Sequence, residues 1–210
     1  WAQFNVKSTF SKYSKIASRS GMTGFDSARR ILDANGLGDV RIAHVSGDLT
    51  DHYNPTDNTI YLSDSVYGSN SAAAIGVAAH EAGHAVQHAT GYTPIKIRSA
   101  IIPITNIGSN LAMPLIILGI ILSFPTLAYI GVAAFGLSTL FQLVTLPVEF
   151  DASGRALKAL EGSLDGEDLA SARKVLRAAA LTYVAALAVS LVNLLRLLII
   201  VAGNDRRRRR

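Results

Sequence analysis

No charged residue occurs in the 50 positions from Ser99 to Val148. A membrane-spanning helix needs about 20 predominantly apolar residues, so this run is long enough for two helices and a tight turn. Ser123-Phe-Pro-Thr126 contains the proline expected of such a turn. The run predicts a transmembrane hairpin with spans at Ile107–Phe124 and Leu127–Leu146, and with Ile101–Asn106 near the membrane interface.

A second apolar run, Ala178–Asn204, is interrupted only by Arg196 and predicts a third span. Arg196 lies within about three helical turns of Arg206, so its side chain can snorkel towards the basic end of the chain. A functional charge inside the membrane is the alternative. Arg206–Arg210 account for the whole net charge of +5. A terminal basic run after an apolar segment favours a membrane anchor or topology signal over nucleic-acid binding.

The composition agrees with a membrane protein, since 50% of residues are hydrophobic and 17% are charged. The absence of cysteine excludes disulfides, thiolate zinc sites, a cysteine nucleophile and iron–sulfur ligation. Trp1 and Phe4, followed by three lysines within the next eleven residues, suit the rim of a membrane span lying just before this chain.

Residues 1–98 have the character of a soluble segment. A capping box at Thr23-Gly-Phe-Asp26 begins a helix that Asn35-Gly36 ends. Three strands are expected after it, at Val40–Val45, Leu49–Tyr53 and Thr59–Leu62. We expect Thr59–Leu62 to be an edge strand that aligns an extended substrate. The predicted fold is a membrane α+β protein, mainly helical, with a small sheet and three transmembrane helices.

A second helix follows the sheet and carries three histidines. Ser69-Asn-Ser71 supplies N-cap residues, and the alanine-rich run after it favours a helix. Residues four apart on a helix are rotated by about 40° and displaced by about 6 Å, so His80 and His84 can bind one metal ion. His88 lies about 12 Å along the axis from His80 and cannot join them. His88 is expected at the surface or as a residue that supports one of the metal ligands without binding the metal.

The pattern His80-Glu-Ala-Gly-His84 is HExxH, in which the glutamate acts as general base for the water that the metal activates. The alternative pair of His84 and His88 encloses no carboxylate. Small residues at Ala82 and Gly83 leave room around the site. An exposed helix with incidental polar residues would also match the motif, but this helix is otherwise apolar, and its polar groups need partners. The motif therefore predicts zinc bound by His80 and His84, with Glu81 as base.

A catalytic zinc takes three protein ligands and leaves a fourth position to water. The metzincin pattern is excluded because Gln87 stands where its glycine belongs. Glu149, in Glu149-Phe-Asp-Ala-Ser-Gly-Arg155, comes immediately after the predicted hairpin. Two crossings return the chain to the side it left, so topology permits Glu149 to reach the zinc.

Five motifs distributed along nearly the whole chain are specific enough to suggest a family. They are Ala2-Gln-Phe, Leu49-Thr-Asp-His-Tyr53, Ile75-Gly-Val-Ala-Ala-His-Glu-Ala-Gly-His84, Phe141-Gln-Leu-Val-Thr-Leu-Pro-Val-Glu-Phe150 and Ala178-Ala-Ala-Leu-Thr-Tyr-Val184. The chain resembles the YugP-type membrane zinc peptidases, also described as the neutral zinc metallopeptidase family of bacterial membranes. This resemblance implies a span upstream of Trp1 and a gluzincin-like site of His80, His84 and Glu149, with Glu81 as base.

A more distant likeness is to the HtpX and CAAX-processing membrane peptidases, whose third-ligand helix reads E-F-x-A-D. Ser153 stands at the position of that aspartate. The carboxylate that supports a ligand in that group is therefore missing here or supplied elsewhere, for example by Asp151.

The remaining candidates have ordinary alternatives. His52 is a candidate for stabilising the oxyanion of the tetrahedral intermediate, with Tyr53 as a competitor, and the alternative is a turn residue bonded to its neighbours. His44 is expected to be structural. Asp151 and Arg155, four apart, are expected to form a helix pair.

We expect an integral membrane zinc endopeptidase that acts on membrane or membrane-proximal proteins, in the cell membrane, with its catalytic face in the cytoplasm. The competing hypothesis is a non-enzymatic scaffold or partner subunit with a structural zinc site, and a transporter is a third. The expected organisation is a soluble part with the sheet and HExxH helix (1–98), a transmembrane hairpin (99–148), helices with the third zinc ligand (149–177), a transmembrane helix (178–205) and a basic tail (206–210).

Overall fold

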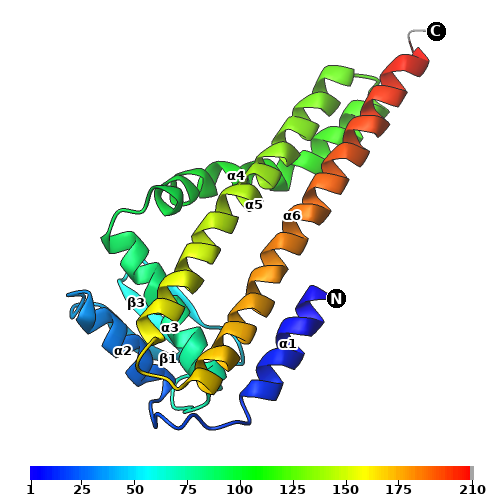
Figure 1. Ribbon diagram of the computed structural model, residues 1–210. Coiled ribbons are helices and arrows are strands. Elements are labelled where there is room, and N and C mark those ends of the chain that lie inside the picture. Colours follow the sequence, from blue (N-terminus) through cyan, green and yellow to red (C-terminus); the bar gives the residue numbers. More distant parts are fainter. Residues whose placement is uncertain (209–210) are drawn as a thin grey trace. The chain divides into compact units, whose positions relative to one another are not determined.

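The computed structural model describes residues 1–208, and side chains through Asp205. As predicted, the described chain is mainly helical, with a small sheet and three helices long and apolar enough to cross a membrane. In chain order the elements are α1 (Ala2–Tyr13), α2 (Gly24–Ala34), β1 (Arg41–Val45), β2 (His52–Asn54), β3 (Thr59–Ser63), α3 (Ala72–Ala89), α4 (Thr93–Ile121), α5 (Pro125–Leu160) and α6 (Gly166–Arg208) (Figure 1).

The chain divides into two compact units. Unit 1 comprises Trp1–Ile95 and Pro147–Thr182, and it holds α1 to α3, the sheet and the ends of α5 and α6. Unit 2 comprises Lys96–Leu146 and Tyr183–Arg210, and it holds the apolar parts of α4, α5 and α6. Helices α5 and α6 therefore each contribute to both units.

Helices α2 and α3 begin where the sequence predicts. Thr23 accepts from the backbone N–H of Asp26, whose carboxylate accepts from Thr23 in return, so the capping box is present. Ser71 caps α3 by accepting from the backbone N–H of Ala74. The buried core of unit 1 forms between these helices and the sheet, with Ala28, Leu32, Ile60 and Ile75 among its fully buried side chains.

The sheet has the strand order β1-β3-β2, with β1 parallel and β2 antiparallel to β3. The prediction of Thr59–Leu62 as an edge strand is wrong, because β3 lies in the centre of the sheet. Its Ile60 and Leu62 side chains are fully buried, as a central strand requires. Strand β2 pairs with β3 on one side only and lies at an edge of the sheet.

Strand β2 is shorter than predicted and starts at His52 instead of Leu49. Leu49 has a φ of 55°, which is incompatible with an extended strand. The carboxylate of Asp51 accepts hydrogen bonds from the backbone N–H and the hydroxyl of Ser63, at 2.8 and 2.9 Å. At this position a side chain, and not the main chain of the neighbouring strand, bonds β3. The predicted strand at Val40–Val45 is present as β1, where His44 bonds Asp64 at 2.6 Å in the structural role expected of it.

Two glycines of α3 permit close helix packing within unit 1. A Cβ atom at Gly83 would lie 2.7 Å from the carbonyl oxygen of Ala152 on α5, and one at Gly76 would lie 3.1 Å from the Cβ of Ala172 on α6. Real Cβ atoms do not approach a backbone oxygen at 2.7 Å. Glycine at 83 thus allows the backbone of α5 to lie directly against α3, three residues from Glu149.

In unit 2 the hairpin turn is close to its predicted place. Helix α4 ends at Ile121, Ser123 has a φ of 62°, and α5 begins at Pro125, a residue favoured at the first helical position. Helix α4 starts at Thr93, well before the predicted span, and continues through Pro103 and Pro114. Cβ atoms at Gly119 and Gly131 would lie 2.4 and 2.7 Å from backbone atoms of the facing helix, so small residues bring α4 and α5 together.

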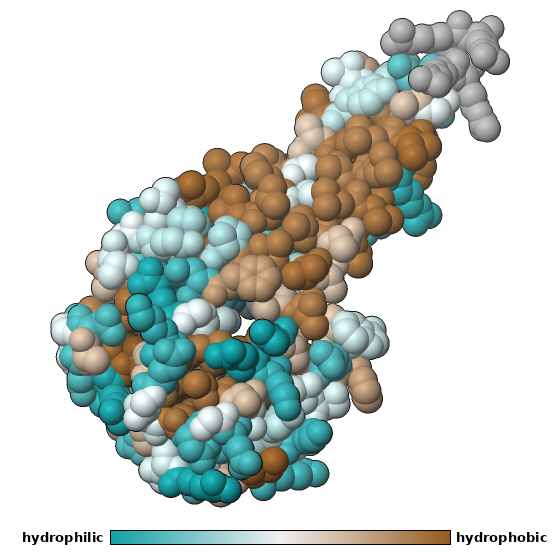
Figure 2. All heavy atoms as spheres, viewed as in Figure 1, coloured by the Kyte–Doolittle hydropathy of each residue, from teal (hydrophilic) through white to brown (hydrophobic). Residues whose placement is uncertain are grey.

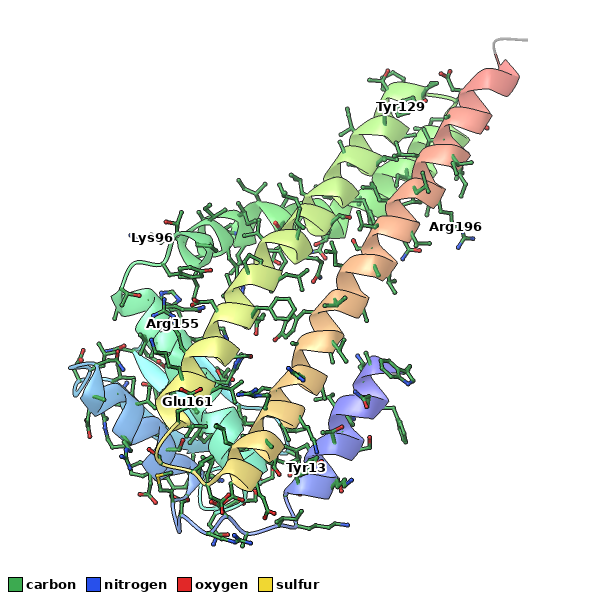
Figure 3. The ribbon with its side chains drawn as sticks, in the orientation of Figure 1. Tyr13, Lys96, Tyr129, Arg155, Glu161 and Arg196 are labelled. Atoms are coloured by element: carbon green, nitrogen blue, oxygen red, sulfur yellow. The ribbon has the colours of Figure 1, made fainter. Side chains whose placement is uncertain are left out.

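Most of the large apolar side chains of unit 2 point outward, and Figure 2 shows them as a continuous hydrophobic surface over its helices. Such a surface is typical of helices that face lipid. Arg196 is exposed on α6 and points away from α4 and α5 (Figure 3). The most exposed of the apolar side chains are Ile107, Ile121, Leu122, Val189, Val192 and Ile199.

Candidate metal centre

Helices α3 and α5 bring together the predicted ligands His80, His84 and Glu149. One ligand atom from each residue lies within 4.8 Å of the others. The Nε2 atoms of His80 and His84 are 3.3 and 3.6 Å from Oε2 of Glu149. His84 and Glu149 are buried and His80 is partly buried, so these polar groups are held together inside the protein.

The spacing and chemistry of these donors fit zinc. Two imidazole nitrogens and a carboxylate oxygen are a common ligand set of catalytic zinc sites. Bonds of about 2.0 to 2.1 Å in a tetrahedron place neighbouring ligand atoms about 3.3 Å apart. The two N···O distances of 3.3 and 3.6 Å are close to this value, so a zinc ion requires little movement of the side chains.

The electrostatics of the site favour a cation. Burial lowers the pKa of His84, but the contact with Glu149 and the negative charges of Glu81 and Glu149 outweigh it and raise this pKa above its usual range. The same carboxylates attract a metal cation. A proton on His84 and a metal ion therefore compete for one electron-rich site.

The strand β2 holds the predicted general base. The backbone N–H of Tyr53 donates to Oε2 of Glu81 at 2.9 Å, and Glu81 is 8% exposed. This hydrogen bond fixes one carboxylate oxygen next to the histidine pair. Sequence reasoning missed it, because a backbone donor leaves no residue signature.

The first histidine is supported from behind by Ser153. The hydroxyl of Ser153 lies 3.1 Å from Nδ1 of His80, where it can accept the ring N–H. A metal-binding histidine usually donates its second ring N–H to an acceptor in this way. Ser153 thus takes the place of the aspartate in the related E-F-x-A-D pattern, with a neutral acceptor in place of a charged one.

Asp151 is linked to the second histidine, His84, through the side chain of Gln87. Nδ1 of His84 lies 3.0 Å from Oε1 of Gln87, and Nε2 of Gln87 lies 2.8 Å from Oδ2 of Asp151. Asp151 also forms the predicted pair with Arg155 at 2.6 Å, and the Arg155 guanidinium, on α5 (Figure 3), lies over the ring of Tyr92. Gln87 is therefore a second residue that sequence reasoning missed. Its position as a polar residue in an apolar helix was the available signal.

The group of three candidate ligands does not include His52 or His88. His88 packs against the ring of Tyr53, with centroids 5.5 Å apart, and is not among the three grouped ligands. His52 is exposed on β2, stacks on Tyr61 at 4.9 Å, and has Nδ1 2.9 Å from the carbonyl oxygen of Thr50. The hydroxyl of Tyr53 donates to Asn58, so this competitor of His52 is engaged elsewhere.

Known proteins include a family and a relative similar to this chain. The family model described as "Putative neutral zinc metallopeptidase" matches residues 1–202. The chain is 49% identical over 208 residues to a Bacillus subtilis (strain 168) protein described as "Putative membrane protease YugP", an alignment that covers 98% of this chain and 92% of that protein. No solved structure matches the chain. The chain belongs to the neutral zinc metallopeptidase family.

Proposed function

We propose that this protein is an integral membrane, zinc-dependent endopeptidase of gluzincin type that hydrolyses peptide bonds of membrane or membrane-proximal proteins. One observation carries the proposal: His80, His84 and Glu149 are grouped closely enough to bind one metal ion. The carboxylate of Glu81 is not part of this group, and the main chain of β2 holds it in place. Membership of a zinc metallopeptidase family and the identity to a membrane protease support it.

Bound at the three ligands, zinc would polarise the scissile carbonyl and make a water molecule acidic enough to attack near neutral pH. Glu81 then accepts the proton of the attacking water at its carboxylate and passes it to the leaving amine. The Tyr53 N–H keeps the carboxylate oriented while the proton moves. Ser153 and Gln87 keep the ring protons of the two histidines on Nδ1, so that both Nε2 atoms face the metal.

The edge strand β2 is the element suited to align an extended substrate. Tyr53 pairs with Ile60 across the sheet, yet its N–H bonds Glu81 and so points away from β3. In an antiparallel ladder the carbonyl of such a residue points the same way, and can accept from the main chain of a peptide. A substrate strand added beside β2 would thus pass Glu81.

His52, on the same strand, is our candidate for stabilising the oxyanion. Its Nδ1–H donates to the Thr50 carbonyl, so Nε2 carries a proton only in the imidazolium form. In that form the Nε2–H group can donate a hydrogen bond to the developing oxyanion. The ring is exposed, so solvent can stabilise the positive charge of the imidazolium.

We also propose a multi-pass position in the cell membrane, with the catalytic face in the cytoplasm, and protein or peptide substrates with no nucleic-acid partner. Membrane-protein partners would meet the lipid-facing helices of unit 2. Single cysteines introduced in place of Arg30 and in the basic tail test the orientation. Modification of position 30 by a membrane-impermeant reagent in intact cells would contradict it.

The decisive experiment is Glu81→Gln, which preserves the acceptor for Tyr53 N–H but removes the ability to take a proton. A positioned base contributes about 10²- to 10⁴-fold in rate. The variant should bind zinc like the parent and lose turnover of a membrane-protein substrate by that factor. Activity at the parental rate would refute Glu81 as base.

Measurements on the unmodified protein distinguish an enzyme from a scaffold with a structural zinc site. A structural zinc is closed by a fourth protein ligand, whereas a catalytic zinc keeps a position for water. X-ray absorption at the zinc edge reports whether the fourth donor is a protein group. Four protein donors, together with no cleavage across a panel of membrane-protein substrates, would favour the scaffold.

A further inference from the structure

Gln87 lies at the junction of the two helices that carry the metal ligands. It is fully buried, and each of its polar atoms has a defined partner. The amide oxygen faces Nδ1 of His84 at 3.0 Å. The amide nitrogen donates to the carbonyl oxygen of Val148 and to Oδ2 of Asp151, both at 2.8 Å.

These partners permit only one orientation of the amide. Val148 O and the Asp151 carboxylate are both acceptors, so the NH₂ group must face them. The amide oxygen must then face His84, where it can only accept. His84 is therefore required to keep its proton on Nδ1, which leaves the lone pair of Nε2 for the metal.

The same hydrogen bonds link the second ligand to the third. Val148 immediately precedes Glu149, and Asp151 follows it by two residues on α5. A fully buried side chain of α3 that bonds both positions sets how far α5 is rotated and displaced along its axis relative to α3. Arg155, 2.6 Å from Asp151, holds the carboxylate at the far end of the chain of bonds.

We propose that Gln87 is a positioning residue for the metal centre: it fixes the tautomer of His84 and the register of α5, and so determines the affinity for zinc. The proposal rests on the zinc site described above. It assigns to Asp151 a role at His84, transmitted through an uncharged amide.

Three variants and a control test it by zinc affinity, measured by competition with a chelator in detergent. Gln87→Met keeps the length of the side chain but removes all three hydrogen bonds. Changes to groups that support zinc-binding histidines cost about 10- to 100-fold in metal affinity, and we expect a loss in this range. Thr90→Val removes a hydroxyl at the end of the same helix that bonds the main-chain carbonyls of Val86 and Gln87. It leaves the three hydrogen bonds of the Gln87 side chain in place, so the affinity should be unchanged.

The pair Gln87→Glu and Asp151→Asn separates positioning from packing. Gln87→Glu alone places a carboxylate against the Asp151 carboxylate and the Val148 carbonyl, and it should weaken zinc binding. Adding Asp151→Asn removes the second of the two opposed carboxylates, and its NH₂ group can donate to the new one. Gln87 and Arg155 both donate to Oδ2 of Asp151, so Arg155 then has to move to the amide oxygen, and the Val148 carbonyl still lacks its donor. The double variant should bind zinc more tightly than Gln87→Glu and more weakly than the parent, since only one of the two lost hydrogen bonds is restored, with reversed direction.

Cobalt substitution gives a readout that packing alone would not change. The visible absorption spectrum of the Co²⁺ protein should differ from the parent in Gln87→Met and match it in Thr90→Val. Parental zinc affinity and an unchanged cobalt spectrum in Gln87→Met would overturn the proposal. If Gln87→Met fails to fold, the double variant decides, and its failure to exceed Gln87→Glu in zinc affinity would also overturn it. A parent protein that binds no zinc would refute the proposed function and this proposal together.

Discussion

The two units bury different kinds of polar group. Unit 1 buries charged and titratable side chains that bond one another, whereas the buried polar side chains described in unit 2 are threonines: Thr105, Thr139 and Thr145. Thr145 donates to the carbonyl of its own helix at Phe141, and Thr139 pairs with Ser190 at 2.7 Å. The difference teaches that hydrogen bonds set side-chain positions at the candidate metal centre, while close contact of small residues sets helix positions among the long apolar helices.

The largest effect is expected for Glu149→Ala, which removes the α5 carboxylate that contacts both histidines. Structural zinc sites bind with about 10 to 16 kcal/mol, or about 2.5 to 4 kcal/mol for each of four ligands. Zinc affinity should therefore fall by about 10²- to 10³-fold, and activity with it. Chelator competition beside turnover is the measurement. Retention of the parental affinity would point to another third ligand.

Matched glycine substitutions come next, because the two units use the same kind of close contact. A Cβ at Gly83 or at Gly131 would lie 2.7 Å from a carbonyl oxygen of the facing helix, on Ala152 and Ala112 respectively. Overpacking of this kind costs about 1 to 3 kcal/mol. Gly83→Ala should lower both stability and zinc affinity, since it displaces the segment that carries Glu149.

Gly131→Ala should lower stability in detergent by a similar amount and leave zinc affinity unchanged. Thermal unfolding and chelator competition on the same preparations give both quantities. Equal losses of zinc affinity in the two variants would show that the site depends on the packing of the spans.

A third prediction concerns the carboxylate of Asp51 and tests how a partly buried charge in unit 1 affects the stability of the protein. Burial raises the pKa of Asp51 above its usual value, with a further contribution from Glu81, although Ser63 bonds oppose the shift. A raised carboxyl pKa means that the folded state binds the proton more tightly than the unfolded state does. The ionised form therefore destabilises the protein at neutral pH, and stability recovers as pH falls through the folded pKa.

Asp51→Asn keeps an acceptor for the Ser63 N–H and removes the charge. It should be more stable than the parent at pH 7 by less than about 1 kcal/mol, and this difference should vanish in acid, where Asp51 is neutral. Denaturant unfolding at several pH values measures it. A stability advantage that persisted below pH 4 would contradict the assignment to charge.

The smallest effect is expected for Thr139→Val, the unit 2 counterpart. Hydrogen bonds between membrane helices contribute about 0.6 kcal/mol on average. The variant should lose about that much stability, with zinc content and turnover at parental levels. A drop in zinc affinity would refute the separation of roles between the units.

The grouping of the three side chains was predictable because their chemistry has sequence signatures. Spacing of four along a helix places His80 and His84 together, and the hairpin of α4 and α5 returns Glu149 to their side. The two hairpin helices were predictable from the 50 uncharged positions, apart from the start of α4, and the apolar part of α6 was predictable from the run Ala178–Asn204. The regular period of an α-helix carries this information directly.

What sequence reasoning missed depends on tertiary contacts. Gln87 entered only as the residue that excludes a metzincin, because its partners lie more than 60 positions away on α5. Gly83 was interpreted as room for the site, whereas it makes room for the backbone of α5. Strand β2 was misplaced because Asp51 bonds Ser63 instead of continuing the ladder, a choice that local propensity does not determine.

The contact between Tyr53 and Glu81 has a consequence for mutational surveys. The donor is a main-chain amide, which every residue except proline supplies. Replacing Tyr53 by alanine removes the ring that packs on His88 but leaves the Glu81 carboxylate held as before, so a side-chain scan would score position 53 as a packing residue alone. An amide-to-ester substitution at position 53, which deletes the single N–H and retains the tyrosine, is the change that isolates this hydrogen bond's part in the proposed catalysis.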